Sequence, residues 1–331
     1  MCKLSAIIAV SLVSVAAASF TLPVRADECQ LKEVASLDLT DFGYRPLVPV
    51  TIEGQGALML VDTGTPISAL DPRAVRSLNL ITRRMFQGMM INSRGKSFDA
   101  VADLKTFAIG NLTAQDKRFL VDPDPITGDS RVAGLLGADF LRNYDFDIDF
   151  AAKKLDVFDQ DHCPGKVIYW PAGAVAVVPM HVENSGHIVV PVTLDGQQID
   201  ALFDTGTSHT ILWASAATQY FNLSPNSPGM QLVSKAGDAP PIYRRQFKSL
   251  SLEGIMISDP IVDIVENEAG QAIQEDAPTG SRISSAGEEN GVTSMILGMR
   301  ELQNLHIFVS YKEQKLYVTA PTPSATAPSS P

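Results

Sequence analysis

Short apolar runs broken by turn residues fill most of this chain, and they are typical of β-strands. Segment 46–62 contains two such runs around the turn Glu53-Gly54-Gln55-Gly56, which predicts a β-hairpin. Residues 145–150 and 155–158 predict a second hairpin that closes the first half of the chain. Further strands of this half are expected at 100–109, 118–121 and 132–137.

Helical signals are few and short. Asp71-Pro72-Arg73, followed by apolar residues, predicts a short helix with proline at its first position. A second short helix is expected at 139–142, and 88–96 reads as another hairpin with its tip at 93–95. The pattern as a whole therefore predicts an all-β fold.

The second half of the chain repeats the first. The phrase Leu60–Thr65 returns as Leu202–Thr207, at an offset of 142 positions (204 − 62). A later block, which includes Gly137 and Gly298, matches at an offset of 161 (298 − 137). This internal duplication predicts two similar lobes. The residues with identical partners at the first offset are Val48, Pro49, Val50, Thr51, Gly54, Gln55, Leu60 and Leu70.

The second repeat is 19 residues longer than the first (161 − 142). Most of the extra length falls in 266–291, a segment rich in Glu, Asp, Gly, Ala and Ser that is expected to form a mobile loop. Its acidic residues are Glu266, Glu268, Glu275, Asp276, Glu288 and Glu289.

Composition and charge narrow the class of protein. A chain of 331 residues with 45% hydrophobic and 19% charged residues is long enough for two lobes with packed cores. The net charge of −11 argues against a nucleic-acid partner, since no cluster of Lys and Arg offsets it locally.

The N-terminus resembles an export signal. Lys3 precedes an apolar run, 4–20, that leads to Val24-Arg25-Ala26, so residues 1–26 are interpreted as a cleaved signal peptide. The protein is then expected to be secreted or periplasmic, with no membrane span after cleavage; a retained N-terminal anchor is the alternative. At the other end, 321–331 is a Pro/Ser/Thr/Ala tail that is expected to be disordered.

Two cysteines remain after removal of residues 1–26. Cys29 and Cys163 flank the first repeat, and in an oxidising compartment they could form a disulfide that closes that lobe. Two unpaired thiols are the alternative. His162 adjoins Cys163, but no second pair of ligands follows at zinc spacing, so neither a metal nor a cofactor is expected.

The chemistry lies in the duplicated aspartates, Asp62 and Asp204. Two carboxyl groups held close together share one proton and work as a general acid–base pair. The structural alternative is that each Asp only caps backbone amides in a turn. His209 follows the second motif, but its counterpart is the apolar Ile67, so His209 is expected at the surface or in a pocket rather than paired with Asp204.

These motifs resemble the retropepsin-like aspartic proteases, once in each repeat: a strand, Asp-Thr-Gly, a short helix, a flap hairpin, a hydrophobic-hydrophobic-Gly strand and a last helix. The resemblance implies two closed β-barrel lobes, 27–165 and 166–320, that form a pseudo-twofold dimer within one chain. It also implies a monomeric endopeptidase that hydrolyses polypeptides with water. Asp62 and Asp204 would be catalytic, supported by Thr63, Gly64, Thr65, Thr205, Gly206 and Thr207.

Within this resemblance, Thr63 and Thr205 would bond across the two lobes, while Thr65 and Thr207 would each donate a hydrogen bond to a carboxylate. The second flap, 231–241, departs from the family's glycine-rich pattern, because its tip carries a single glycine, Gly237.

The acidic insertion 266–291 enters where a loop of the family lines the cleft, so it is expected to act as a lid or selectivity filter; a surface loop without a role is the alternative. Two other functions stay open. One is a non-catalytic peptide-binding scaffold, and the other is a latent protease gated by 266–291.

Overall fold

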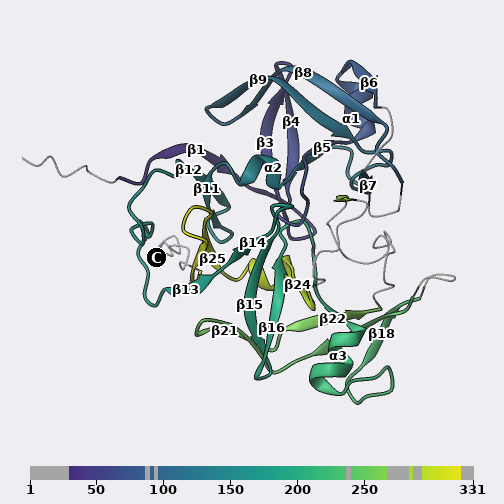
Figure 1. Cartoon of the computed structure of the whole chain (residues 1–331), viewed down its shortest axis with the longest axis vertical. Coiled ribbons are helices and arrows are strands. Elements are labelled where there is room, and N and C mark those ends of the chain that lie inside the picture. Colours follow the sequence, from purple (N-terminus) through teal and green to yellow (C-terminus); the bar gives the residue numbers. More distant parts are fainter. Residues whose placement is uncertain are drawn as a thin grey trace, which may run out of the picture.

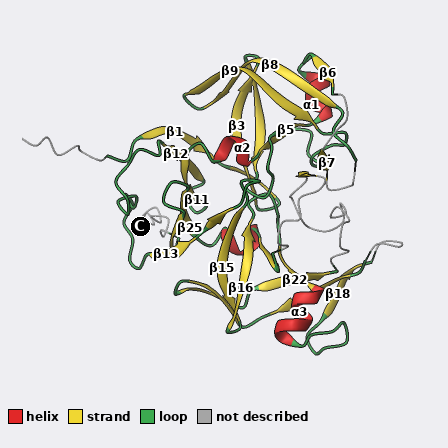
Figure 2. Cartoon of the chain, in the orientation of Figure 1, coloured by secondary structure: helices red, strands yellow, loops and turns green. Residues whose placement is uncertain are grey.

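The computed structural model describes residues 30–85, 90–92, 96–235, 240–266, 283–285 and 293–321. Two β-rich lobes lie one above the other, and a third sheet lies beside them on the left of Figure 1. Strands dominate and the helices are short, as Figure 2 shows, so the predicted all-β, two-lobed fold is confirmed. Within the described residues, no helix is long and apolar enough to cross a membrane.

The first lobe is built on one sheet in the order β2-β3-β4-β10-β5-β9-β8-β6. A further pairing of β3 with β8 joins the two sides of this sheet and closes a six-stranded barrel. The strands are β2 (Thr40–Phe42), β3 (Arg45–Ile52), β4 (Gln55–Val61), β5 (Ala69–Leu70), β6 (Thr82–Arg84), β8 (Ala100–Ile109), β9 (Leu112–Val121) and β10 (Val132–Leu136).

The second lobe repeats this path in a sheet of order β18-β19-β22-β17-β24-β16-β15-β20-β21, with β14 (His181–Val182) paired to β15. Its strands are β15 (Ile188–Leu194), β16 (Gln197–Phe203), β17 (Thr210–Trp213), β18 (Gln231–Ser234), β19 (Ile242–Gln246), β20 (Ser249–Leu252), β21 (Ile255–Ser258), β22 (Ile261–Val265) and β24 (Met295–Leu297).

The two lobes differ in their long hairpin. In the first lobe β8 and β9 are continuous, and in the second lobe the corresponding strands are interrupted at 247–248 and 259–260. Pro260 at this break has no N–H to donate to the ladder. The backbone bonds Phe247 N→Pro260 O (2.9 Å) and Asp259 N→Lys248 O (3.0 Å) hold the two broken strands together.

The predicted hairpin of segment 46–62 is β3–β4, and its turn has a simple backbone reason. Glu53 and Gly54 have φ values of 50° and 77°, and the matching Asp195 and Gly196 have 43° and 84°. Positive φ at both central residues characterises the two-residue turn that fits the right-handed twist of the strands. The same turn therefore starts the same barrel in each lobe.

Four short helices are described: α1 (Pro72–Ser77), α2 (Ala138–Leu141), α3 (Ala214–Phe221) and α4 (Met299–Leu302). As predicted, α1 begins with proline, and Asp71 caps it by accepting a hydrogen bond from the Arg73 N–H at 2.7 Å. α2 and α4 directly follow Gly137 and Gly298.

A six-stranded sheet unites the lobes, in the order β1-β12-β11-β25-β26-β13. Strand β11 of the first repeat pairs with β25 of the second, with Asp147 opposite Phe308. The strands are β1 (Glu33–Asp38), β11 (Asp145–Asp149), β12 (Lys154–Phe158), β13 (Ala176–Pro179), β25 (His306–Ser310) and β26 (Lys315–Thr319). The closing hairpin of the first half, expected at 145–150 and 155–158, is β11–β12 of this sheet.

A buried polar network holds this shared sheet together. The Asp145 carboxylate lies 2.7 Å from His162 Nε2 and accepts hydrogen bonds from Ser310 Oγ (2.7 Å) and the Tyr311 N–H (2.9 Å). His306 lies 2.8 Å from Asp147, and Asp145, Asp147 and both histidines are buried. These contacts join side chains of the two repeats within the shared sheet.

Among the described residues, the insertion of the second repeat contributes one strand, and this strand pairs with a strand of the first lobe. β23 (Ile283–Ser285) pairs antiparallel with β7 (Met90–Asn92), which belongs to the flap predicted at 88–96 (Figure 1). The rest of 267–292, the tip of that flap, residues 1–29 and 322–331 lie outside the described residues.

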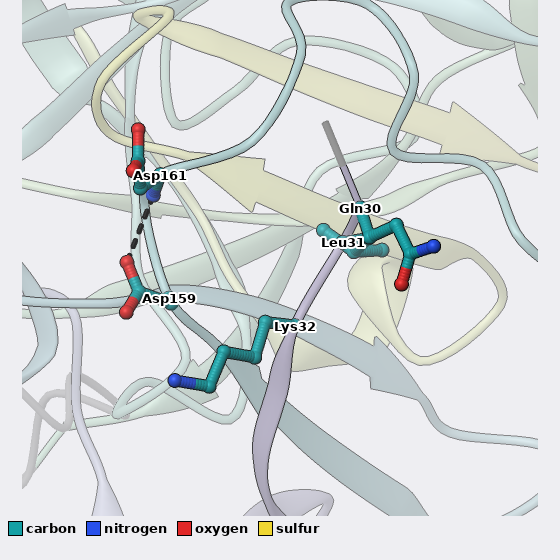
Figure 3. A pocket seen from close by; sticks show the side chains of 5 residues that line it. All are labelled: Gln30, Leu31, Lys32, Asp159 and Asp161. Carbon is teal, nitrogen blue, oxygen red and sulfur yellow. Dashed lines mark hydrogen bonds between the residues drawn. The ribbon is translucent and has the colours of Figure 1, made fainter. Parts of the chain in front are cut away.

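The N-terminal segment packs beside the end of the first repeat. Figure 3 shows a pocket that is lined by Gln30, Leu31 and Lys32 from one side and by Asp159 and Asp161 from the other. The Asp161 N–H donates to the Asp159 carboxylate at 2.9 Å. Cys29 lies outside the described residues, so its disulfide with Cys163 stays a prediction, as do the lobe boundaries at 27, 165, 166 and 320.

Candidate active site

Each Asp-Thr-Gly-Thr loop begins where a barrel strand ends. Asp62 follows β4, which runs parallel to β10, and its N–H donates to Leu136 O at 3.0 Å. Asp204 follows β16, parallel to β24, and its N–H donates to Leu297 O at 3.1 Å. Parallel neighbours end at the same edge, so the loops leave the two lobes from equivalent points.

Two threonines join the loops across the lobe interface. Thr63 Oγ1 donates to Phe203 O at 2.7 Å and accepts the Thr205 N–H at 3.1 Å. Thr205 Oγ1 in turn donates to Val61 O at 2.7 Å and accepts the Thr63 N–H at 3.2 Å. All four bonds are buried, so each hydroxyl satisfies backbone groups of the opposite lobe and fixes one loop against the other.

Each carboxylate receives two hydrogen bonds from its own loop. Asp62 accepts the Gly64 N–H at 3.1 Å and Thr65 Oγ1 at 3.0 Å. Asp204 accepts the Gly206 N–H at 2.8 Å and Thr207 Oγ1 at 2.5 Å. The donors occupy matching positions in the two loops, and the bonds around Asp204 are the shorter ones.

The structure brings the two loops into direct contact. A Cβ added to Gly206 would lie only 2.2 Å from Asp62 Cγ, so the Asp62 carboxyl packs on the backbone of the other loop. Asp62 and Asp204 are both fully buried. A glycine at 206 is therefore needed for the close approach, because any side chain would displace the carboxyl group.

Burial raises the pKa of Asp62 well above its usual value, and the negative charge of Asp204 raises it further. The hydrogen bonds from Thr65 and Gly64 and the positive charge of Arg45 act in the opposite direction but are weaker. The raised pKa means that Asp62 keeps its proton to a higher pH than a solvated aspartate does. Such a pair is able to accept a proton from one group and donate one to another.

The helices behind the loops hold them through backbone bonds. The Ala138 N–H of α2 donates to Thr65 O, and the Met299 N–H of α4 donates to Thr207 O, both at 2.8 Å. A Cβ at Gly298 would lie 2.3 Å from His209 O, and one at Gly137 would lie 2.8 Å from Thr65 O. This contact explains why the hydrophobic-hydrophobic-Gly motif appears in both repeats.

Other residues around the loops were not identified from the sequence. Arg45 begins β3, whose register of Leu47 opposite Leu60 brings it beside Asp62. Behind the loops, Ser68 bonds to Asp139 and Thr210 bonds to Glu301. Ser68 and Thr210 match at the repeat offset, which was a usable signal, whereas the proximity of Arg45 depends on strand register.

His209 is half-buried, and burial lowers its pKa to about 4, with the nearby Arg300 acting in the same direction. Its other charged neighbours are Asp263 and Arg244. Trp213 is buried, and its indole N–H donates to Thr293 O at 2.7 Å, so it belongs to the hydrophobic core. In the part of the chain that the structure describes, no group of three or more His, Cys, Asp or Glu side chains is arranged to hold a metal.

The match to a family model agrees with this geometry. The model of the aspartyl protease family matches residues 48–140 and 190–301, which include both Asp-Thr-Gly-Thr loops. Among solved structures, the crystal structure of basic 7S globulin from soybean matches with 14% identity and a TM-score of 0.46, over 88% of this chain and 95% of the other. No curated protein sequence matches. Since the family model covers more than half of the chain, once in each lobe, the chain belongs to the aspartyl protease family.

Proposed function

We propose that this protein is an aspartic endopeptidase in which Asp62 and Asp204 activate the water that hydrolyses a peptide bond. One observation carries the proposal: the Asp62 carboxyl packs against Gly206 of the second loop, close enough to Asp204 for the two carboxyl groups to interact electrostatically. Membership of the aspartyl protease family supports the same chemistry.

The mechanism follows from a shared proton. The charged carboxylate of the pair takes a proton from a bound water as the water oxygen attacks the scissile carbonyl carbon. The protonated carboxyl stabilises the negative charge that develops on the carbonyl oxygen. A proton then passes to the leaving nitrogen, the C–N bond breaks, and the products are a carboxylic acid and an amine. The pair acts as a unit, so no single Asp is assigned the proton.

The working form is a monomer exported from the cytoplasm. Each lobe supplies one of the two aspartates, so a single chain contains both halves of the site. The charged residue and apolar run at the N-terminus, ahead of Val24-Arg25-Ala26, support export to the periplasm or the medium.

The test compares the chain lacking residues 1–26 with its Asp62→Asn and Asp204→Asn variants on a mixed peptide library, from about pH 3 to 8. Asn keeps the shape of Asp but does not ionise. We expect peptide cleavage by the parent and a loss of at least about a thousandfold in each variant. Cleavage that survives both substitutions would disprove the paired-aspartate mechanism.

Two other functions give different results in the same assay. A peptide-binding scaffold binds library peptides at all pH values and cleaves none. A latent protease cleaves only after the insertion is removed; the pairing of β23 with the flap strand β7 is the observation that favours this version.

A further inference from the structure

Glu301 is a buried acid directly behind the second Asp-Thr-Gly-Thr loop. Glu301 belongs to α4 and its side chain is buried. Thr210 Oγ1 donates a short hydrogen bond to its carboxylate. Thr210 Oγ1 also accepts the Gly298 N–H at 3.1 Å. The Ile261 backbone provides a further hydrogen bond to the carboxylate. Glu301 thus connects three elements, α4, β17 and β22.

These elements in turn hold the loop that carries Asp204. The Met299 N–H donates to Thr207 O at 2.8 Å, and the Arg300 N–H donates to Ser208 O at 3.1 Å. Thr207 is the residue whose hydroxyl bonds the Asp204 carboxylate. A shift of α4 relative to β17 would therefore be transmitted to the hydrogen bonds of Asp204 through two backbone contacts.

The first lobe makes the same connection without a buried acid. There the Ser68 N–H and Oγ donate to Asp139 at 2.8 and 2.7 Å, and Ser68 Oγ accepts the Gly137 N–H at 3.0 Å. Asp139 is exposed to solvent, and the position that matches Glu301 is Phe140. The duplicated fold therefore does not need an acid at this position to form.

A buried carboxyl is costly, and the cost depends on pH. Burial raises the pKa of Glu301 to about 7, against the opposing effects of Thr210, Arg300 and the backbone N–H groups. The folded protein thus keeps the proton on Glu301 across the acidic range, and the carboxyl becomes charged near neutral pH. Ionisable groups with displaced pKa values cluster at functional sites.

The charged groups around this position are few. Arg300 lies next to Glu301 in the chain and lowers its pKa. Arg244 forms a two-pronged ion pair with the buried Asp263, with distances of 2.6 and 2.9 Å. His209 lies near Arg300, Asp263 and Arg244, and its pKa of about 4 keeps it neutral in the range where Glu301 titrates.

We propose that Glu301 is a positioning residue that holds the Asp204 loop through Thr210 and Gly298 while it is protonated, and releases that loop when it ionises. A charge in this buried position is stabilised only if α4 and β17 separate enough to admit water, because the loss of hydration outweighs the gain from the Thr210 hydrogen bond. The second lobe therefore carries a proton-dependent support that the first lobe lacks. Only the expected effect of Glu301 on the rate of peptide cleavage rests on the proposed peptidase function.

The activity test compares kcat/KM against pH for the parent, Glu301→Gln and Asp139→Asn. Gln keeps the size of Glu and the oxygen that accepts from Thr210, but it does not ionise. For each protein, the ratio of kcat/KM at pH 8 to kcat/KM at pH 5 is compared. We expect this ratio to be about threefold or more higher in Glu301→Gln than in the parent. Asp139→Asn, which changes the exposed acid that Ser68 bonds in the first lobe, is expected to leave the shape of the profile unchanged. Parallel profiles for the parent and Glu301→Gln would overturn the proposal.

A second measurement does not need activity. We expect backbone hydrogen exchange of segment 204–212 at pH 8 to be faster in the parent than in Glu301→Gln, and equal in the two proteins at pH 5. Equal exchange at both pH values would overturn the proposal even in an active enzyme. Faster exchange in the parent at pH 8, in a protein that cleaves no peptide, would support the role of Glu301 and reject the proposed peptidase function instead.

Discussion

At the scale of single residues, Thr65 and Thr207 set how acidic the aspartate pair is. Each hydroxyl donates a buried hydrogen bond to one carboxylate, at 3.0 and 2.5 Å. Donation to a carboxylate stabilises its charged form and lowers its pKa.

The double variant Thr65→Ala/Thr207→Ala tests this effect. Without the two hydroxyls the charged form loses stabilisation, so the pKa of the pair rises and the pH of maximal activity moves upward by about one unit. The pH–rate profile measures the shift. Thr51→Ala, at the far end of β3, serves as the control for loss of a threonine hydroxyl. An unmoved profile in the double variant would contradict the assignment.

At the scale of elements, the two loops depend on each other. Thr63 Oγ1 donates a hydrogen bond to Phe203 O and accepts one from the Thr205 N–H. Both partners are buried backbone groups of the opposite lobe. Substitution to Val keeps the shape of the side chain but removes its hydroxyl, which leaves one donor and one acceptor without a partner.

We therefore expect Thr63→Val to lower the free energy of unfolding by about 2 kcal/mol or more, since an unsatisfied buried polar group costs about 1–3 kcal/mol. Denaturant unfolding measures the loss. Thr63→Ser keeps the hydroxyl and is expected to recover most of the stability. If Val and Ser destabilise the protein equally, the cross-lobe bonds do not contribute to stability.

At the scale of the whole molecule, the contacts between the lobes in the described residues include three kinds: the paired threonines, the shared six-stranded sheet and the pairing of β23 with β7. The third contact differs from the others, because it is made by a segment with no counterpart in the first repeat. A strand of the insertion lies at the edge of the flap, where an extended peptide could also pair.

Replacing 267–292 with the shorter loop 122–131 of the first lobe tests that contact. If the insertion gates the site, the exchange frees the edge of β7, and we expect faster cleavage of polypeptides, seen mainly as a lower KM. Melting curves of the exchanged and parent proteins check that the fold is kept. Activity that does not change with the exchange would rule out gating.

Much of this architecture could be predicted from the sequence. Alternating apolar residues around Glu53-Gly54 predict a hairpin because a two-residue turn with positive φ suits the twist of two such strands. The expected strand 100–109 is β8, and 118–121 proved to be only the end of the longer β9. β9 is mostly exposed over its first half, so alternation gives no signal there. The repeat located Asp62 and Asp204 because a duplicated loop must occupy equivalent places in two similar lobes.

The sequence by itself thus determined the duplication, the strand content and the eight residues of the two Asp-Thr-Gly-Thr loops, since these depend on local pattern and on identity between the repeats. Only the tertiary structure decided how the lobes are joined. The shared sheet with its buried Asp145 and Asp147, the proximity of Arg45 to Asp62 and the link from Glu301 to Thr210 all arise between segments far apart in the chain. Strand register and burial create such contacts, and neither is expressed in the local order of residues.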